Sequence, residues 1–93
     1  MQFLVISQRD EQNFTSDDFD AVIPAETEQV RNLYGESVIR QIWLRDDVRG
    51  ACFLLEAKSL KQAETIVGAL PIAQRGMSDF QIIPLRPYGG FVS

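Results

Sequence analysis

Histidine is absent from this sequence of 93 residues, and cysteine occurs only once, as Cys52. Without histidine, the Ser-His-Asp and Cys-His catalytic arrangements and histidine metal sites are excluded. A lone cysteine can form neither an intrachain disulfide nor a cysteine-based zinc site, which favours a cytoplasmic setting. The sequence also lacks a glycine-rich phosphate loop and a dinucleotide fingerprint. We therefore expect no metal and no cofactor, and any catalysis must come from carboxylates, Arg, Lys, Tyr or Cys52.

An excess of positive charge is also lacking. The chain has 13 acidic and 9 basic residues, a formal net charge of −4, and its Lys and Arg are scattered. Such a chain has no field that attracts phosphate backbones, so we expect no nucleic-acid partner. No apolar run approaches the roughly 18 residues needed to cross a bilayer, so we expect no membrane partner. Residues 1–6 are apolar but lack a basic start and turn polar at Ser7, which predicts a strand rather than a signal peptide.

The length of the chain leaves room for one hydrophobic core, and we expect a single domain over residues 1–93. A domain of this size buries only about 60–65% of the surface that its unfolded chain exposes. Association with further copies would therefore add useful burial.

The local patterns predict a strand, a helix, a β-hairpin, a second helix and a last strand. Thr15 and Ser59 are suited to be N-caps of the two helices, and Pro71 ends the second. Pro24 predicts a kink near Ile23, or two helices with Pro24 opening the second. Pro84 predicts an edge position or a bulge for the last strand. The expected elements cover residues 3–6, 16–35, 38–45, 51–57, 60–70 and 80–85.

This order predicts an α+β fold of ferredoxin-like βαββαβ topology, a four-stranded antiparallel sheet with two helices on one face. The other face of the sheet stays uncovered. Residues 38–44 carry large apolar groups at both parities, and residues 52–55 do the same in the facing strand. A strand that is apolar on both sides is buried on both sides. We therefore expect a homodimer, or an assembly of dimers, that joins two sheets into a dimeric α/β barrel.

Glu26 is the most informative single residue. At 100° per residue it falls in the apolar stripe of the first helix, which includes Phe19, Val22 and Leu33, so its carboxylate should point toward the sheet. A carboxylate in an apolar pocket has a raised pKa that suits a general acid or base. Two alternatives remain open at this point: Glu26 reaches solvent near Pro24 and has no role, or it forms a buried ion pair.

Arg40 is the second candidate, because it shares its predicted strand face with apolar residues and a buried guanidinium needs a partner. It would bind a substrate carboxylate, form a structural ion pair with Glu26 or Glu56, or extend to the edge of the sheet. Trp43 and Tyr34 are candidates for the wall of a binding pocket, with a core or interface position as the alternative.

A series of short motifs covers nearly the whole chain. They are the run Glu36-Ser37-Val38-Ile39-Arg40-Gln41-Ile42-Trp43, then Phe53, Ser59-Leu60, Leu70-Pro71-Ile72, Met77 and Pro84-Leu85-Arg86-Pro87. In this order and spacing they resemble the muconolactone δ-isomerase family.

The resemblance implies a ferredoxin-like dimeric α/β barrel that assembles further and shifts a proton in a small lactone carboxylate without metal or cofactor. Glu26 and Glu28 match acidic positions of the family's first helix, and Arg40 and Trp43 match its strand motif. Two positions depart from the family: Gln41 stands where the family enzyme has a histidine, and Thr27 where it has a lysine. The predicted site therefore has Glu26 and Arg40 as catalytic residues and Trp43, Tyr34 and Gln41 as substrate-binding residues.

Three functions remain in competition. The first is a cofactor-independent isomerase acting on a small acidic metabolite, in which Glu26 moves the proton and Arg40 holds a carboxylate. The second is a non-catalytic small-molecule-binding or assembly module on the same dimeric barrel. The third, a monooxygenase or haem-binding relative, is disfavoured because no histidine is present to bind haem iron.

Overall fold

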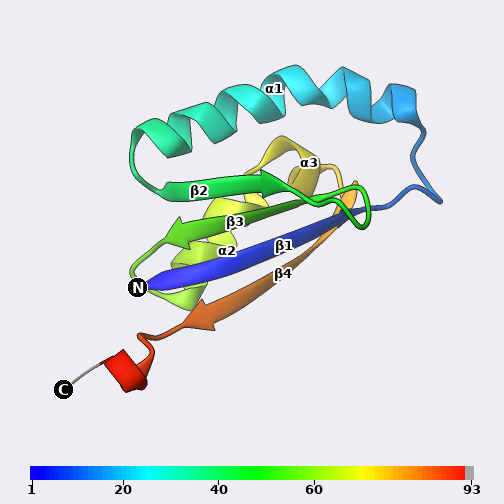
Figure 1. Ribbon diagram of the computed structural model, residues 1–93. Coiled ribbons are helices and arrows are strands. Elements are labelled where there is room, and N and C mark those ends of the chain that lie inside the picture. The colour runs from blue at the N-terminus through cyan, green and yellow to red at the C-terminus, as the bar shows by residue number, and fades with distance from the viewer. Residues whose placement is uncertain (92–93) are drawn as a thin grey trace.

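The computed structural model describes residues 1–91 and consists of one antiparallel sheet with helices packed against it (Figure 1). The strand order is β2-β3-β1-β4, so β2 and β4 are the edges. This is the predicted ferredoxin-like α+β arrangement, which is confirmed. The elements are β1 (Gln2–Arg9), α1 (Ser16–Gly35), β2 (Ile39–Leu44), β3 (Ala51–Glu56), α2 (Leu60–Gly68), α3 (Pro71–Gln74), β4 (Ser78–Leu85) and the 3-10 helix η1 (Gly89–Phe91).

Helix α1 begins at the predicted cap. The Thr15 hydroxyl accepts a hydrogen bond from the Asp18 N–H at 3.2 Å, and the Asp18 carboxylate accepts one from the Thr15 N–H at 2.7 Å. This capping box satisfies two N–H groups that the first helical turn cannot. The helix then runs without interruption through Pro24, so the alternative of two separate helices is wrong.

Helix α2 begins at the predicted cap, whereas the short helix that follows it was not predicted. The hydroxyl of Ser59 caps α2 by accepting from the N–H of Gln62 at 3.1 Å, as predicted. The one-turn helix α3, in which Pro71 is the first residue, was not expected from the local patterns. Proline is favoured there because its fixed φ suits a helix and its missing N–H would have had no partner.

The hydrophobic core lies between the sheet and the helices, and alternate residues of each strand contribute to it. Phe3 and Val5 of β1 lie opposite Leu55 and Phe53 of β3, and these side chains are buried. They contact apolar residues of both long helices. The helical members of this core are Leu33, Ala63 and Val67.

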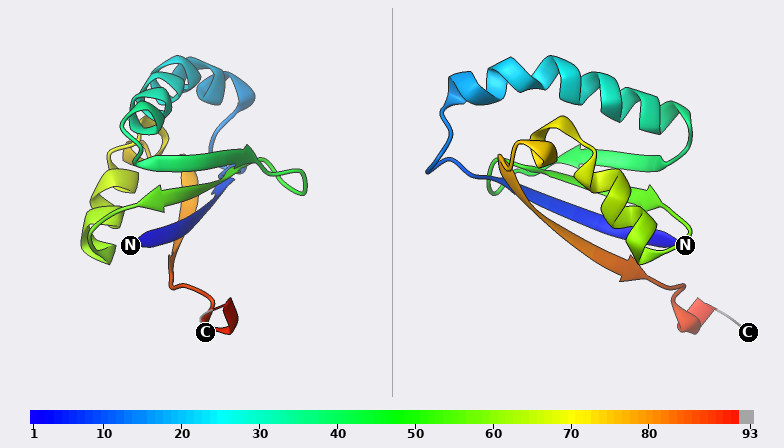
Figure 2. Two further views of the ribbon diagram at one scale, coloured as in Figure 1. Left: turned by 60° about the vertical axis from the view of Figure 1, so that its left-hand side comes forward. Right: turned by 180° about the vertical axis from the view of Figure 1, so that it is seen from behind.

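The opposite face of the sheet is not covered by any helix of the described chain, as Figure 2 shows from two directions. The strand registers place apolar side chains at its centre, and they are only partly buried. We call this surface the open face. It is formed by Leu4, Ile6, Trp43, Cys52, Leu54 and Ile83.

Strand β2 departs from simple alternation at Arg40. Ile39 lies opposite Leu55, but Gln41 lies opposite Leu54, so one residue is inserted on the β2 side of the pair. After this bulge the even-numbered residues, and not the odd ones, face the helices. Arg40 itself is exposed, and the prediction that it is buried on the sheet is wrong.

Candidate functional site

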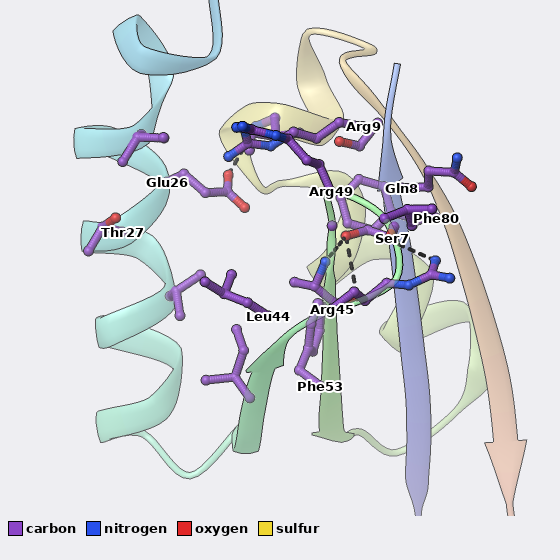
Figure 3. Close-up of a pocket in the computed structure, with 18 of the residues that line it drawn as sticks. Ser7, Gln8, Arg9, Glu26, Thr27, Leu44, Arg45, Arg49, Phe53 and Phe80 are labelled. Carbon is purple, nitrogen blue, oxygen red and sulfur yellow. Dashed lines mark hydrogen bonds between the residues drawn. The ribbon is translucent and has the colours of Figure 1, made fainter. Parts of the chain in front are cut away.

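A cleft of about 1020 Å3 lies between α1 and the end of the sheet where β1 ends and β4 begins. The side of α1 that faces the sheet forms one wall. The other wall is formed by the ends of the strands and by the turn of residues 45–50 between β2 and β3. Figure 3 shows Glu26 on α1 facing Phe53, Phe80 and the turn across this space.

The cleft has an apolar part and a charged part. Its apolar lining comes from α1, the strands and α3, and Leu44 within it is 86% exposed. The charged part lies at the end of β1 and at the turn. A cleft with this division suits a small ligand that has an apolar body and a polar group. The apolar lining includes Ile23, Val30, Ile42, Leu44, Phe53, Ile72 and Phe80.

Glu26 reaches the cleft because it lies on the same side of α1 as the buried residues Phe19 and Val22. Its side chain is partly buried, and one carboxylate oxygen accepts a hydrogen bond from the backbone N–H of Ile72 at 3.0 Å. Burial raises the pKa of the Glu26 carboxyl above its usual value of 4.5, and the bond from Ile72 opposes this with a smaller effect. Among residues 1–91, no cation lies within ion-pair distance of this carboxylate.

The turn of residues 45–50 is tied to β1 by several contacts. The Arg45 guanidinium pairs with the Asp47 carboxylate at 2.7 Å, which lowers the pKa of Asp47 to about 2, and donates to the Ser7 carbonyl at 3.3 Å. The Ser7 hydroxyl accepts from the N–H of Ala51 at 2.9 Å. A Cβ on Gly50 would lie 2.0 Å from the Ser7 carbonyl oxygen, so this close approach requires glycine.

Of the five residues predicted for the site, only Glu26 lines the cleft. Trp43 and Gln41 lie on the other face of the sheet, opposite Cys52 and Leu54. Arg40 is exposed at the bulge, and Tyr34, near the end of α1, is 58% exposed. The structure therefore does not bring these four side chains together with Glu26 in this cleft, and their proposed roles stay predictions.

Four arginines line the cleft, and the sequence analysis singled out none of them. Arg9 is the last residue of β1, Arg31 lies on α1, and Arg45 and Arg49 belong to the turn between β2 and β3. One sequence signal could have pointed to two of them. If β1 and β3 pair as in a ferredoxin-like sheet, arginines at the end of β1 and just before β3 meet at one end of that pair.

Within residues 1–91, no three carboxylate or thiol groups lie close enough together to hold a metal ion. In the same part of the chain, no helix has the length and apolar character that crossing a membrane requires.

The arrangement of sheet, helices and cleft defines an α+β protein with a candidate small-molecule site between α1 and the sheet. Neither a scan against protein families nor a search of curated proteins found a match. Comparison with solved structures shows that the fold is similar to that of muconolactone isomerase, with a TM-score of 0.81 over 100% of this chain and 96% of that chain, at 15% sequence identity. The ferredoxin-like fold that the sequence motifs imply is thus supported by the structure.

A second solved structure shares the fold. It is the 5-chloro-2-hydroxyhydroquinone dehydrochlorinase of Burkholderia phenoliruptrix, in complex with 2,5-dihydroxybenzoquinone. Its TM-score is 0.68 at 15% identity, and the alignment covers 97% of this chain and 98% of that chain. At this level of identity both comparisons establish the fold.

Proposed function

We propose that this protein is a cofactor-independent isomerase of the muconolactone isomerase type, which shifts a proton within a small acidic metabolite held in the cleft. Glu26 carries the proposal. Its carboxylate removes a proton from one carbon of the substrate and returns it to another, so the enzyme ends unchanged. A raised pKa helps this role, because an acid or base works best when its pKa lies near the working pH.

The lining of the cleft supports the same substrate class. Phe53 and Phe80 offer apolar surface to the body of a ring or an unsaturated chain, while the arginines offer donors to an anionic group. Muconolactone isomerase and the dehydrochlorinase, the two proteins with similar folds, both bear names of enzymes that act on small organic molecules. Fold likeness alone does not establish function, so the proposal depends on Glu26 and on the lining of the cleft.

A second candidate, the non-catalytic binding or assembly module, is favoured by the hydrogen bond from Ile72 to Glu26. Leu70, the N-cap residue of α3, has no side-chain acceptor, and the Glu26 carboxylate supplies one from α1. In this interpretation Glu26 joins α1 to α3, and its burial serves stability. The predicted ion pair with Arg40 has no support, since no carboxylate of the described chain lies within 4.0 Å of that guanidinium.

Self-association through the open face is part of both candidates. Its centre holds the partly buried Leu4, Ile6 and Leu54, and Trp43 beside them is 49% exposed. Apolar surface of this kind is stabilised by a second copy packed sheet to sheet. We therefore propose a homodimer that buries this face and leaves the two clefts on the outer, helix-covered sides of the sheets.

The experiment that tests the proposed function follows carbon-bound hydrogens by NMR in D2O. The protein is incubated with muconolactone and with a panel of small unsaturated lactones and keto acids that carry a carboxylate. We expect exchange or double-bond migration with at least one compound, and its loss in Glu26→Gln, because an amide keeps the shape but cannot carry the proton. Equal exchange in both proteins, or none with any compound, would favour the binding or assembly module.

A further inference from the structure

Arg9 and Arg49 lie beside each other across two antiparallel strands. The register of β1 and β3 places Ile6 opposite Cys52, and the backbone N–H of Arg9 donates to the carbonyl of Arg49 at 2.9 Å, which continues that pairing past the end of β3. Both side chains line the cleft. In Figure 3 they extend from this end of the sheet toward α1 and Glu26.

Two cations at facing positions of a strand pair destabilise the pair unless something neutralises them. Within the described chain, the only ion pairs join the N-terminus to Glu56 and Arg45 to Asp47. Neither Arg9 nor Arg49 is therefore paired with a carboxylate. Glu11 and Asp46 also line the cleft, but they too form no ion pair with either guanidinium. The fold thus places two arginines without carboxylate partners at facing backbone positions beside an apolar cleft.

Arg9 is also held in place on one side. Its guanidinium carbon lies 4.5 Å from the centroid of the Phe19 ring, a cation–π contact that orients the side chain without neutralising its charge. Arg49 is exposed and lies on the turn that Arg45 and Ser7 tie to β1. The guanidinium of Arg9 is oriented by Phe19, and that of Arg49 belongs to a turn that is bound to β1. Together they can supply several N–H donors to a planar oxyanion.

We propose that Arg9 and Arg49 form the anion subsite of the cleft and bind the carboxylate of the substrate, in the role that the sequence motifs assigned to Arg40. The inference rests on the proposed function, since it takes the cleft to be the substrate site. The carboxylate of a bound ligand offsets the repulsion between the two cations. The apolar body of the ligand then extends along Phe53 and Phe80 toward Glu26. The site therefore selects ligands with a single carboxylate on an apolar ring or unsaturated chain.

The test compares benzoate with benzamide, which have nearly the same shape and differ in charge. Binding of each is followed by titration with NMR of the backbone amides, in the unmodified protein, Arg49→Gln, Arg9→Gln and the control Arg75→Gln. Arg75 follows α3, is exposed and does not line the cleft, so its replacement changes the net charge equally. We expect a preference for benzoate that both cleft variants lose, with benzoate binding weakened about tenfold or more.

A second measurement keeps the test decisive if Arg9→Gln weakens the fold through loss of the Phe19 contact. Without ligand, Arg49→Gln should unfold at the same or higher denaturant concentration than the unmodified protein, because it removes a like-charge contact. Lower stability in Arg49→Gln, or equal preference for benzoate in Arg49→Gln and Arg75→Gln, would overturn the subsite. Failure of the proposed function is seen separately, as unchanged proton exchange in Glu26→Gln, whatever the arginine variants do.

Discussion

Replacing Glu26 separates its two possible roles, because glutamine and alanine remove different parts of its contacts. In Glu26→Ala the N–H of Ile72 loses its acceptor at 3.0 Å. A buried donor left without a partner costs about 1–3 kcal/mol, and partial exposure of this region points to the lower half of that range. Glu26→Gln keeps an oxygen at the same reach, so the free energy of unfolding should change by less than about 1 kcal/mol at pH near 4.5.

The pH dependence of stability, compared between Glu26→Gln and the unmodified protein, gives a sharper result. Burial raises the pKa of Glu26 in the folded protein, so the folded state binds the proton more tightly than the unfolded chain. The slope of stability with pH is then negative: stability falls as pH rises from the ordinary value of 4.5 through the folded pKa, and the loss is complete above it. Glutamine cannot ionise, so the stability of Glu26→Gln does not fall over this pH window. Relative to the unmodified protein, its free energy of unfolding should rise by about 1 kcal/mol or less, because solvent screens a half-exposed carboxylate.

The assay is urea denaturation followed by circular dichroism, at a fixed protein concentration and at several pH values from 4 to 8. A fixed concentration is needed because association adds to the apparent stability. If the difference between Glu26→Gln and the unmodified protein stays constant with pH, Glu26 is a solvated helix residue, and its placement in the cleft gives it no unusual proton affinity. If Glu26→Ala costs nothing, its tie to α3 has no energetic weight.

Three further changes test other parts of the structure. Trp43→Ala should weaken dimer formation about tenfold or more while the dissociated chain stays folded, as seen by sedimentation at several concentrations; an unchanged dimer would exclude the open face as the interface. Gly50→Ala should cost about 1–3 kcal/mol in denaturant unfolding, because its Cβ meets the Ser7 carbonyl, whereas Gly68→Ala, with open space around it, should not destabilise. Arg40→Gln should leave benzoate affinity unchanged, and a marked loss would return Arg40 to the site.

The sequence predicts the order of the elements well because local signals mark their ends. Thr15 and Ser59 cap helices as expected, and Pro84 lies in an edge strand. The placement of Glu26 on the inner side of α1 also follows from helical periodicity, since Phe19 and Val22 fix which side is buried. Pro24 misleads in one respect, because the helix continues through it and does not divide.

The position of Arg40 could not be predicted because it depends on one bulge in β2. Strict alternation puts Arg40 on the face of Ile42 and Leu44, which is the face of the cleft. The bulge between Ile39 and Gln41 leaves Arg40 exposed as the extra residue, while Ile42 and Leu44 still reach the cleft. No glycine or proline marks this position, so local sequence carries no signal for it.

The anion subsite lies beyond sequence reasoning for a different reason, which concerns pairing over a long separation. Arg9 and Arg49 become neighbours only when β1 pairs with β3, and a slip of one residue in that register would turn one of them to the open face. The register is fixed here by the Ser7 hydroxyl on Ala51 and by the close approach that only Gly50 permits. The same small residues that hold the turn on β1 therefore align the two guanidinium groups, and a change at Gly50 should disturb carboxylate binding together with stability.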